Sequence, residues 1–379
     1  MGKRNAIMIC LGATILVVLG LVMLASTSVW VEDENSKYSH LIKQSIWTGI
    51  GVVLAGIVAS LDYHFFKKHA KAIFIGSVIL LALCYVPGIK HTVNGETRWI
   101  KVPIMGQFQP SEIAKIGVVI ALCSYLALYQ SENRTFRKGF FIPGILIAVP
   151  VMLIFFEKDM GTAVALAAAC FGVLYIAGTR ARYLVITAVS GMSLLFMMVY
   201  INPNRWDRIT SFMDLEANKL GSGLQQWRSI IAFSNGGYNG LGLGNGAEKH
   251  GYLPYAHTDF IFPMVGEELG LWFTLGTIFC YVIIAVYGIG VAIYASDAFG
   301  RLLAIGLTGL IVIPSMMNIG VTTGLLPNTG LPLPFVSYGG TNLVFTLVAV
   351  GLLISIHRRS NFETEDTTRV SKGVVKVRI

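Results

Sequence analysis

The feature that constrains this chain most is a series of about ten apolar runs of near-spanning length. They cover residues 6–27, 44–61, 72–88, 112–129, 140–156, 162–178, 184–201, 265–294, 302–323 and 341–357. A helix needs about 20 apolar residues to cross roughly 30 Å of hydrocarbon. Only 13% of the 379 residues are charged, whereas soluble domains average roughly 25%. The sequence therefore predicts an all-α polytopic membrane protein with about ten transmembrane helices.

The lysines and arginines predict how the chain is oriented. They concentrate in alternate connections, such as 67–71, 134–138 and 180–182, and in the C-terminal tail. Because basic residues mark cytoplasmic loops, the net charge of +9 indicates topology and not a nucleic-acid partner. We expect both termini in the cytoplasm, an integral membrane domain at 1–358 and a basic cytoplasmic tail at 359–379. The large loop 202–258, between the seventh and eighth helices, then lies outside.

The first apolar run and the five cysteines have ordinary structural interpretations. Run 6–27 is followed by further spans and has no convincing small-residue cleavage site, so we expect a retained helix and not a signal peptide. All five cysteines lie in apolar runs, and none forms a CxxC pair. They are typical of small buried residues, and they indicate neither a metal centre nor a disulfide framework.

The stretch 252–268, YLPYAHTDFIFPMVGEE, carries ionisable residues where a polar loop turns into a membrane helix. His257, Thr258 and Asp259 lie at the expected boundary of water and lipid. Glu267 and Glu268 lie beyond them in apolar sequence. An ionisable residue at membrane depth costs roughly 2.5–3.5 kcal/mol on insertion scales, so Asp259 is the candidate catalytic residue. The structural alternative is that Asp259 caps the helix that follows and complements its dipole.

The connection 89–111 combines a turn dipeptide, an Arg-Trp pair at Arg98 and a Gln-Pro-Ser-Glu helix start. Ser111 is placed to cap the helix that follows. Glu112 and Lys115 are three residues apart and share one face of that helix. We therefore expect a structural ion pair between Glu112 and Lys115 at the helix end.

The connection EKDMG, at 157–161, places three charges in a turn between two apolar helices. Its Asp159 precedes Gly161 and Thr162, a pattern typical of a helix N-cap. The local sequence alone therefore predicts a structural role for Asp159.

Loop 202–258 is long, and long loops in compact proteins are usually functional or disordered. Its many aromatic residues argue against disorder. The run GGYNGLGLGNG, 236–246, follows no soluble strand and lacks a Gly-Lys-Ser ending, so it is not a nucleotide-binding loop. Basic side chains here are either solvated or in contact with an anionic ligand. The cationic residues of the loop include Arg205, Arg208, Arg228 and Lys249.

The connection GLLPNTGLPLPFVSYGG, 324–340, contains three prolines, four glycines and no charge. This density of proline and glycine prevents a regular helix, yet the segment is too apolar for a free loop. Irregular backbone at membrane depth is tolerated where it is buried in protein or lines a cavity. We therefore expect a re-entrant segment that forms one wall of a cavity, opposite the Asp259 stretch. Ser337, Tyr338 and Asn342 would offer hydrogen bonds there.

Five motifs occur together in this chain: QPSEIAK, the glycine run with Lys249, YLPYAHTDFIF, GEELG and GLLPNTGLPLPFVSYGG. Together they resemble the SEDS family (shape, elongation, division, sporulation), which is the FtsW/RodA group of bacterial peptidoglycan polymerases. The match runs from about residue 10 to 358. Within the family, YLPYAHTDFIF and the Asn245-Gly246 run look closer to the division branch, FtsW, than to the elongation branch, RodA.

The resemblance implies a peptidoglycan glycosyltransferase that joins lipid II disaccharide units into glycan chains. It would work at the outer face of the bacterial cytoplasmic membrane during cell division. Its implied partners are a class B penicillin-binding protein, which is a transpeptidase, and other membrane proteins of the division complex. Asp259 matches the essential aspartate of the family. Recurrent polar positions match Arg98, Glu112, Lys115, Asp159 and Lys249. The expected substrate-binding residues are Arg98, Lys115, Asp159, Arg208, Lys249, His257, Thr258 and Ser337.

The sequence departs from the family pattern at several loop positions. Tyr255 stands where the family often has Glu, so a second carboxylate near Asp259 is missing. Thr341 and Asn342 stand where two serines are usual. These departures affect the fine chemistry of the loops and not the resemblance itself.

The implied reaction needs a base for the attacking sugar hydroxyl and positive charge for the leaving lipid pyrophosphate. Asp259 can accept the proton if partial desolvation raises its pKa from about 3.9. Arginines and lysines of the outer loops can stabilise the phosphate charge. A divalent cation, Mg²⁺ or Mn²⁺, on the pyrophosphate is compatible with this chemistry, but His257 and Asp259 alone do not make a metal motif.

Other functions fit part of the pattern. Glu267 and Glu268, a re-entrant segment and about ten helices would also suit a lipid II flippase. A transporter should place its substrate-contacting groups near the midplane and show internal repeats, whereas the polar residues here cluster on one side, around long loops. The elongation polymerase of the same family and a non-catalytic division scaffold are the remaining alternatives.

Overall fold

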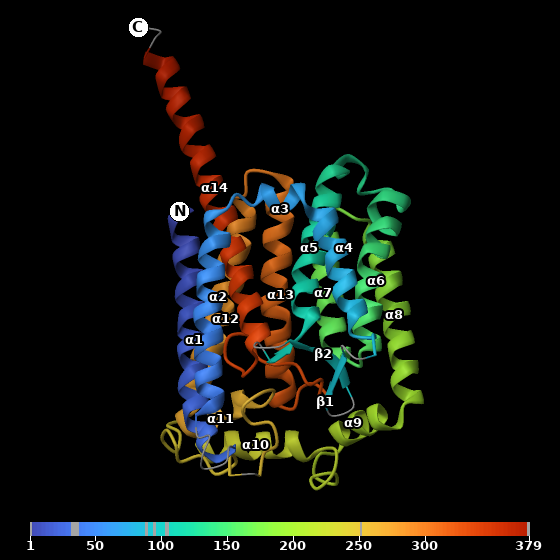
Figure 1. The fold of residues 1–379 in the computed structure, drawn as a ribbon, viewed down its shortest axis with the longest axis vertical. Helices are drawn as coiled ribbons and strands as arrows, with labels where there is room; N and C mark the ends of the chain where they lie inside the picture. The colour runs from blue at the N-terminus through green and yellow to red at the C-terminus, as the bar shows by residue number, and fades with distance from the viewer. Residues whose placement is uncertain are drawn as a thin grey trace.

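The computed structural model describes residues 2–31, 38–87, 90–93, 96–102, 106–250 and 252–376, which form a bundle of long helices with shorter elements across one end (Figure 1). In this described part, eight helices are long and apolar enough to cross a membrane. They are α1 (Gly2–Val31), α2 (Ser39–Ser60), α5 (Pro110–Leu128), α6 (Ile142–Phe156) with its preceding turn η3 (Arg137–Phe141), α8 (Ala181–Ile201), α12 (Leu271–Ile293), α13 (Ala298–Thr322) and α14 (Gly340–Lys376). Two shorter apolar helices, α4 (Ala70–Leu83) and α7 (Met160–Ile176), complete the bundle.

Each of the predicted apolar runs overlaps one of these ten helices, so the predicted class of polytopic helical membrane protein is confirmed. The exact number of spans is not confirmed, because α4 has only 14 residues and α7 only 17. Helix α14 passes residue 358 without a break. All five cysteines are free, and four of them are buried, as expected.

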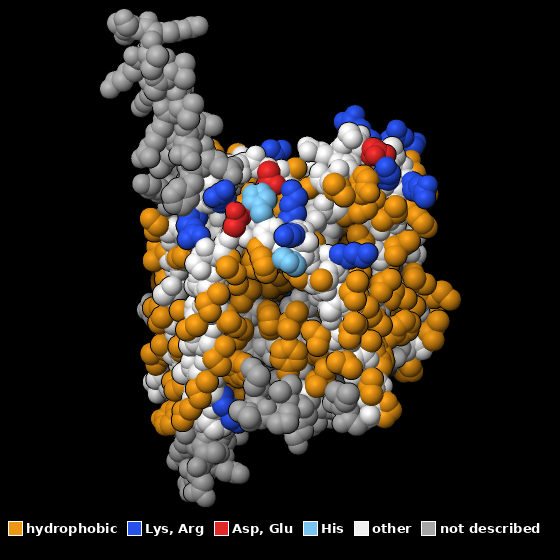
Figure 2. Space-filling model, turned by 45° about the horizontal axis from the view of Figure 1, so that its top comes forward, with side chains coloured by type: hydrophobic (Ala, Val, Ile, Leu, Met, Phe, Trp, Pro, Cys, Tyr) orange, Lys and Arg blue, Asp and Glu red, His pale blue; other side chains and the backbone are white. Residues whose placement is uncertain are grey.

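Helix α13 lies at the centre of the bundle and packs against α5, α7, α12 and α14. Its spanning segment is 67% buried, whereas those of α2 and α8 are only 11% buried. Gly306 permits the tight packing of α13, because a Cβ there would lie 2.4 Å from Cγ1 of Val119. The exposed apolar side chains of the outer helices form the wide hydrophobic surface in Figure 2, as a membrane environment requires.

Short elements cover the end of the bundle opposite the start of α1 and the end of α14 (Figure 1). We call this the loop end, and the opposite one the tail end. Helices α9 (Pro203–Met213), α10 (Leu224–Gly236) and α11 (Ile261–Leu269) lie across it. A small antiparallel sheet of β1 (Lys90–Val93), β2 (Glu96–Val102) and β3 (Gly106–Phe108), in the order β1-β2-β3, lies there too.

Three details of this end differ from the sequence-based expectations. The sheet was not expected, and the apolar run 265–294 is two helices. Gly270, with φ +79°, separates α11 from α12, because its backbone conformation suits glycine and a Cβ there would lie 2.4 Å from the Gly240 nitrogen. Ser111 does not cap α5: the N-cap residue is Gln109 without a side-chain bond, and the Ser111 hydroxyl is buried.

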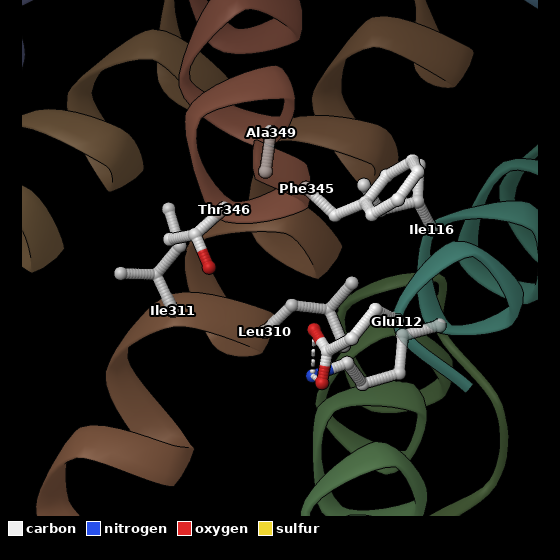
Figure 3. Close-up of a pocket in the computed structure, with 8 residues that line it drawn as sticks. Glu112, Ile116, Leu310, Ile311, Phe345, Thr346 and Ala349 are labelled. Carbon is white, nitrogen blue, oxygen red and sulfur yellow. Dashed lines mark hydrogen bonds and ion pairs between the residues drawn. The ribbon is translucent and has the colours of Figure 1, made fainter. Parts of the chain in front are cut away.

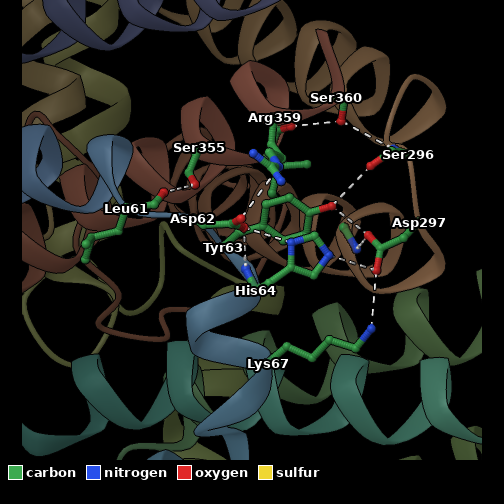
Figure 4. A network of polar contacts seen from close by, with 12 residues as sticks. Leu61, Asp62, Tyr63, His64, Lys67, Ser296, Asp297, Ser355, Arg359 and Ser360 are labelled. Carbon is green, nitrogen blue, oxygen red and sulfur yellow. Dashed lines mark hydrogen bonds and ion pairs between the residues drawn. The ribbon is translucent and has the colours of Figure 1, made fainter. Parts of the chain in front are cut away.

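The tail end is held together by a polar network around the turn from α2 into α3 (His64–Lys68), shown in Figure 4. The buried Tyr63 donates its hydroxyl to Oδ1 of Asp297 at 2.7 Å, and Asp297 accepts the Gly300 N–H at 2.9 Å and so caps α13. Lys67 lies 3.4 Å from the same carboxylate. A further short turn, η2 (Gln130–Glu132), follows α5. Figure 2 shows Lys and Arg side chains gathered at this end.

Candidate active site at the loop end

Asp259 lies half-buried in the turn that leads into α11. It does not cap that helix, because the N-cap residue is Phe260 and the cap has no side-chain hydrogen bond. Its backbone is fixed instead by Asn318 of α13, which donates to the carbonyls of Asp259 at 2.7 Å and Leu331 at 2.6 Å. Phe260, and not Asp259, is therefore the N-cap residue of α11.

The two proline-bearing segments, 252–262 and 324–340, contact each other directly at this turn. Tyr338 donates its N–H to the His257 carbonyl at 2.9 Å, and the Ser337 hydroxyl donates to the Thr258 carbonyl at 2.6 Å. The segments had been expected to face each other across a cavity, and here they are joined by hydrogen bonds. Buried residues such as Leu333 and Phe335 show that the part 331–337 of this irregular segment is mostly buried in protein, whereas 324–330 is partly exposed.

An aromatic cluster lies beside this junction. The rings of His257 and His40 have centroids 5.0 Å apart, and His40 lies 4.5 Å from the ring of Tyr338. Burial, together with the charge of His40, lowers the pKa of His257 to about 4. His257 is therefore neutral at physiological pH, and it can donate or accept a hydrogen bond there but cannot supply positive charge.

The predicted ion pair between Glu112 and Lys115 is present at the start of α5. The Lys115 ammonium lies 2.9 Å from Oε2 of Glu112, and Asn342 of α14 donates to the same oxygen at 3.2 Å. The pair lines a small pocket of about 10 Å³ between α5, α13 and α14 (Figure 3). The other walls of the pocket are apolar except for Thr346. A single ion pair is thus exposed to an otherwise apolar space inside the bundle.

Arg98 and Asp159 form a second ion pair at the loop end. Nη1 of Arg98, on β2, lies 3.5 Å from Oδ2 of Asp159, which also accepts a hydrogen bond from Gln109 at 3.2 Å. Asp159 caps α7 as predicted, because its Oδ1 accepts the Thr162 N–H at 3.0 Å. The Asp159 side chain is 1% exposed and that of Arg98 13%, so Arg98 is the member of the pair that reaches the surface.

The structure places Lys249 in the interior, away from Asp259. Its ammonium contacts the Glu268 carboxylate at 2.7 Å and the Ser26 hydroxyl at 2.9 Å, and Lys249 is 2% exposed. Glu267 accepts the N–H groups of Ala247 at 3.0 Å and Glu248 at 3.2 Å. The two glutamates therefore hold the end of the glycine-rich run against α11 and α1.

Arg208 is also distant from Asp259. It is exposed on α9, which packs mainly against α8 and lies across the loop end from α11 in Figure 1. The structure therefore brings His257, Thr258, Ser337 and Asp259 together, and it leaves Arg208 and Lys249 outside that group.

Sequence reasoning missed three residues that shape this site. Gln44 of α2 donates to the Ser337 carbonyl at 3.1 Å and accepts the Gly339 N–H at 3.2 Å. Asn318 anchors Asp259, and His40 packs on His257. Gln44 and Asn318 are amides inside apolar runs, and a polar side chain in such a run is the signal that could have identified them.

The described residues contain no group of three or more His, Cys, Asp or Glu side chains that could hold a metal ion.

Comparison with known proteins places the chain in a family. The model of the "Cell cycle protein" family, named for FtsW, RodA and SpoVE, matches residues 6–362. A probable peptidoglycan glycosyltransferase FtsW of Geobacter sp. (strain M18) is 36% identical over 349 residues, covering 92% of this chain and 95% of that protein. The stage V sporulation protein E of Bacillus subtilis (strain 168) is 35% identical over 353 residues, covering 92% of this chain and 95% of that protein.

Solved structures agree with this placement. A chain from a study of the structural coordination of polymerization and crosslinking by a peptidoglycan synthase complex has a TM-score of 0.78 and 26% identity, covering 93% of this chain and 97% of that one. The rod shape determining protein RodA of Thermus thermophilus has a TM-score of 0.69 and 26% identity, covering 92% of this chain and 95% of that one. The chain therefore belongs to the FtsW/RodA/SpoVE family of cell cycle proteins.

Proposed function

We propose that the chain is a peptidoglycan glycosyltransferase that joins lipid II disaccharide units during cell division, with Asp259 as its general base. The observation that carries the proposal is the placement of Asp259: it is half-buried, does not cap α11, and has its backbone fixed by Asn318. A carboxylate held at the membrane boundary calls for an explanation, and we assign it the role of general base. Relatives that match over 92% of the chain include one named a probable peptidoglycan glycosyltransferase.

The reaction can be assigned to this site atom by atom. A sugar hydroxyl oxygen forms a bond to the anomeric carbon of a second lipid-linked sugar, and the bond from that carbon to the pyrophosphate oxygen breaks. The hydroxyl proton passes to Asp259, and the lipid pyrophosphate leaves with the bonding electron pair. Because Asp259 lies at the boundary, the lipid tails can stay in the membrane while the sugars react.

We assign two cationic residues to the stabilisation of the pyrophosphate. Arg98 reaches the surface from β2, and Lys115 lines the pocket between α5, α13 and α14. Each is paired with a carboxylate, so the pairs orient the cations before substrate arrives. His257, neutral at physiological pH, would contribute hydrogen bonds to the substrate and not charge.

The same proposal assigns an orientation and a partner. Lys and Arg gather at the tail end, so the tail end faces the cytoplasm and Asp259 the outer face of the membrane. The similarity to a chain of a peptidoglycan synthase complex supports a class B penicillin-binding protein as the crosslinking partner. Other membrane proteins of the division complex would bind the same assembly.

A lipid II flippase is the alternative function, and the contacts of Glu267 and Glu268 help to decide between the two. Glu267 and Glu268 accept hydrogen bonds from loop backbone and from Lys249. They are therefore engaged in holding the loop and do not line a path through the bundle. This arrangement favours the polymerase.

The test is a glycan-synthesis assay with the purified chain and its transpeptidase partner. Fluorescent lipid II is added, and the products are separated on a gel. A ladder of glycan chains supports the proposal, whereas flipping of labelled lipid II in vesicles without any ladder would overturn it in favour of the transporter. The Asp259→Asn protein is the matched control.

A further inference from the structure

Glu157, at the end of α6, is a buried carboxyl that the proposed mechanism does not yet use. Its exposure is 0%, and within the described part of the chain neither of its oxygens has a hydrogen-bond partner within ordinary distance. Buried polar groups in proteins are nearly always hydrogen-bonded, and an exception calls for an explanation. An ionised carboxylate in this position would be costly.

The surroundings of Glu157 contain the second ion pair of the site. Asp159 is two residues away and acts on it with a like charge, and Arg98 acts on it with the opposite charge. Cys84 and Tyr85, at the end of α4, face it from a third element, and the Cys84 thiol is only a weak donor. Burial and the charge of Asp159 raise the pKa of Glu157 to about 8.

We propose that Glu157 is a positioning residue for the pyrophosphate-binding arginine of this site. With its proton bound, Glu157 is neutral and does not compete with Asp159 for the Arg98 guanidinium. When the proton passes to solvent, two buried carboxylates share one guanidinium and the cluster changes from neutral to singly negative. Arg98 is then drawn inward, and the excess negative charge repels an incoming pyrophosphate.

The inference rests on the proposed function, because it assigns Arg98 to the pyrophosphate. It predicts a decline of polymerisation on the alkaline side, governed by Glu157. A group with a pKa of about 8 is about nine-tenths ionised one pH unit higher. If the ionised form binds lipid II poorly, the polymerisation rate at low substrate should fall on the order of tenfold between about pH 7 and pH 9.

The experiment compares Glu157→Gln with the wild-type chain in complex with its partner. Gln has nearly the shape of protonated Glu and cannot ionise, so its rate should change less than about twofold over the same pH range. Glu157→Leu, also unable to ionise, serves if the Gln protein folds poorly. Glu132→Gln, at the tail end, removes a carboxylate paired with Lys138 at 2.7 Å and should keep the wild-type profile.

Infrared spectra of the same proteins give a readout that does not depend on activity. The stretching band of a protonated carboxyl should be present in wild type near neutral pH, absent from Glu157→Gln, and lost from wild type at alkaline pH. Parallel pH profiles for wild type and Glu157→Gln would overturn the inference, as would a missing carboxyl band near neutral pH. If neither wild type nor any variant makes glycan at any pH while the carboxyl band titrates as described, the proposed function is wrong. The conclusion that Glu157 is protonated near neutral pH is then still supported.

Discussion

Asp259 is anchored through its backbone carbonyl, so its side chain can be changed without losing that anchor. Asp259→Asn keeps the size of the side chain and removes its capacity to take a proton. A general base contributes on the order of 10²–10⁴ in rate, so this variant should fold normally and make almost no glycan. The measurement is glycan formation from labelled lipid II together with Tm. Polymerisation at more than about a tenth of the wild-type rate would refute the catalytic assignment.

Glu112 is expected to matter for stability more than for chemistry. Glu112→Ala leaves the Lys115 ammonium, 8% exposed, without its carboxylate partner. Removing one partner of a buried ion pair costs about 3–5 kcal/mol, so Tm in detergent should fall clearly. The exposed pair of Glu132 and Lys138 is the control, because breaking a surface pair costs about 0–1 kcal/mol. Equal melting of Glu112→Ala and wild type would show that the pair is not structural.

At the scale of elements, the glycine-rich run 236–246 is ordered by what it packs against. Gly240 has φ +75°, and a Cβ on it would lie 2.3 Å from the Glu268 carbonyl oxygen, so the run must approach α11 closely. The Gly244 N–H then donates to the Glu268 carboxylate at 3.0 Å. The anion that this amide meets is therefore one of the chain's own glutamates.

A substitution of Lys249 tests whether the end of the glycine-rich run has a structural role or binds substrate. Lys249→Met leaves the buried Glu268 carboxylate with only neutral donors from Ser26 and Gly244. We therefore expect a lower Tm, by an amount corresponding to a few kcal/mol, and an unchanged KM for lipid II in the protein that remains folded. Arg228→Met, which removes a partly exposed loop cation, is the control for general loss of charge. A raised KM with an unchanged Tm would instead place Lys249 against the substrate.

Local elements were predictable from the sequence where their stability depends on residues close together in the chain. The apolar runs identified the bundle because spanning helices need them. Asp159 was identified as a cap because capping depends on near neighbours in sequence. The three-stranded sheet and the break at Gly270 depend on contacts between segments distant in sequence, such as the close approach of Gly270 to Gly240. A linear pattern does not contain that information.

At the scale of the whole molecule, the sequence predicted that the two proline-bearing segments lie opposite each other. It did not predict how they contact each other. Tyr338 and Ser337 bond directly to the backbone at His257 and Thr258. Cationic residues were predicted less well, since Lys249 and Arg208 looked alike in sequence and differ completely in burial. Burial of a charge is decided by a partner from another element, here Glu268. The position of Asp259 beside segment 324–340 was therefore readable from the sequence, and the arrangement of the cations was not.

The orientation of the bundle yields the last prediction. Because Lys and Arg gather at the tail end, a residue at the loop end should be reachable from outside the cell. Leu220, between α9 and α10, is 88% exposed, and Arg134 is exposed at the tail end. A membrane-impermeant maleimide added to spheroplasts should label Leu220→Cys, and it should label Arg134→Cys only after permeabilisation.

The native cysteines give this labelling experiment a low background, since four are buried and Cys10 lies in the membrane-spanning part of α1. The wild-type chain is the control for that background, and cell division supported by each variant shows that it is folded and inserted. Labelling of Arg134→Cys but not Leu220→Cys in intact spheroplasts would put Asp259 on the cytoplasmic side. Lipid II exposed at the outer leaflet could not then reach Asp259, and polymerisation at the outer face would be excluded for this chain.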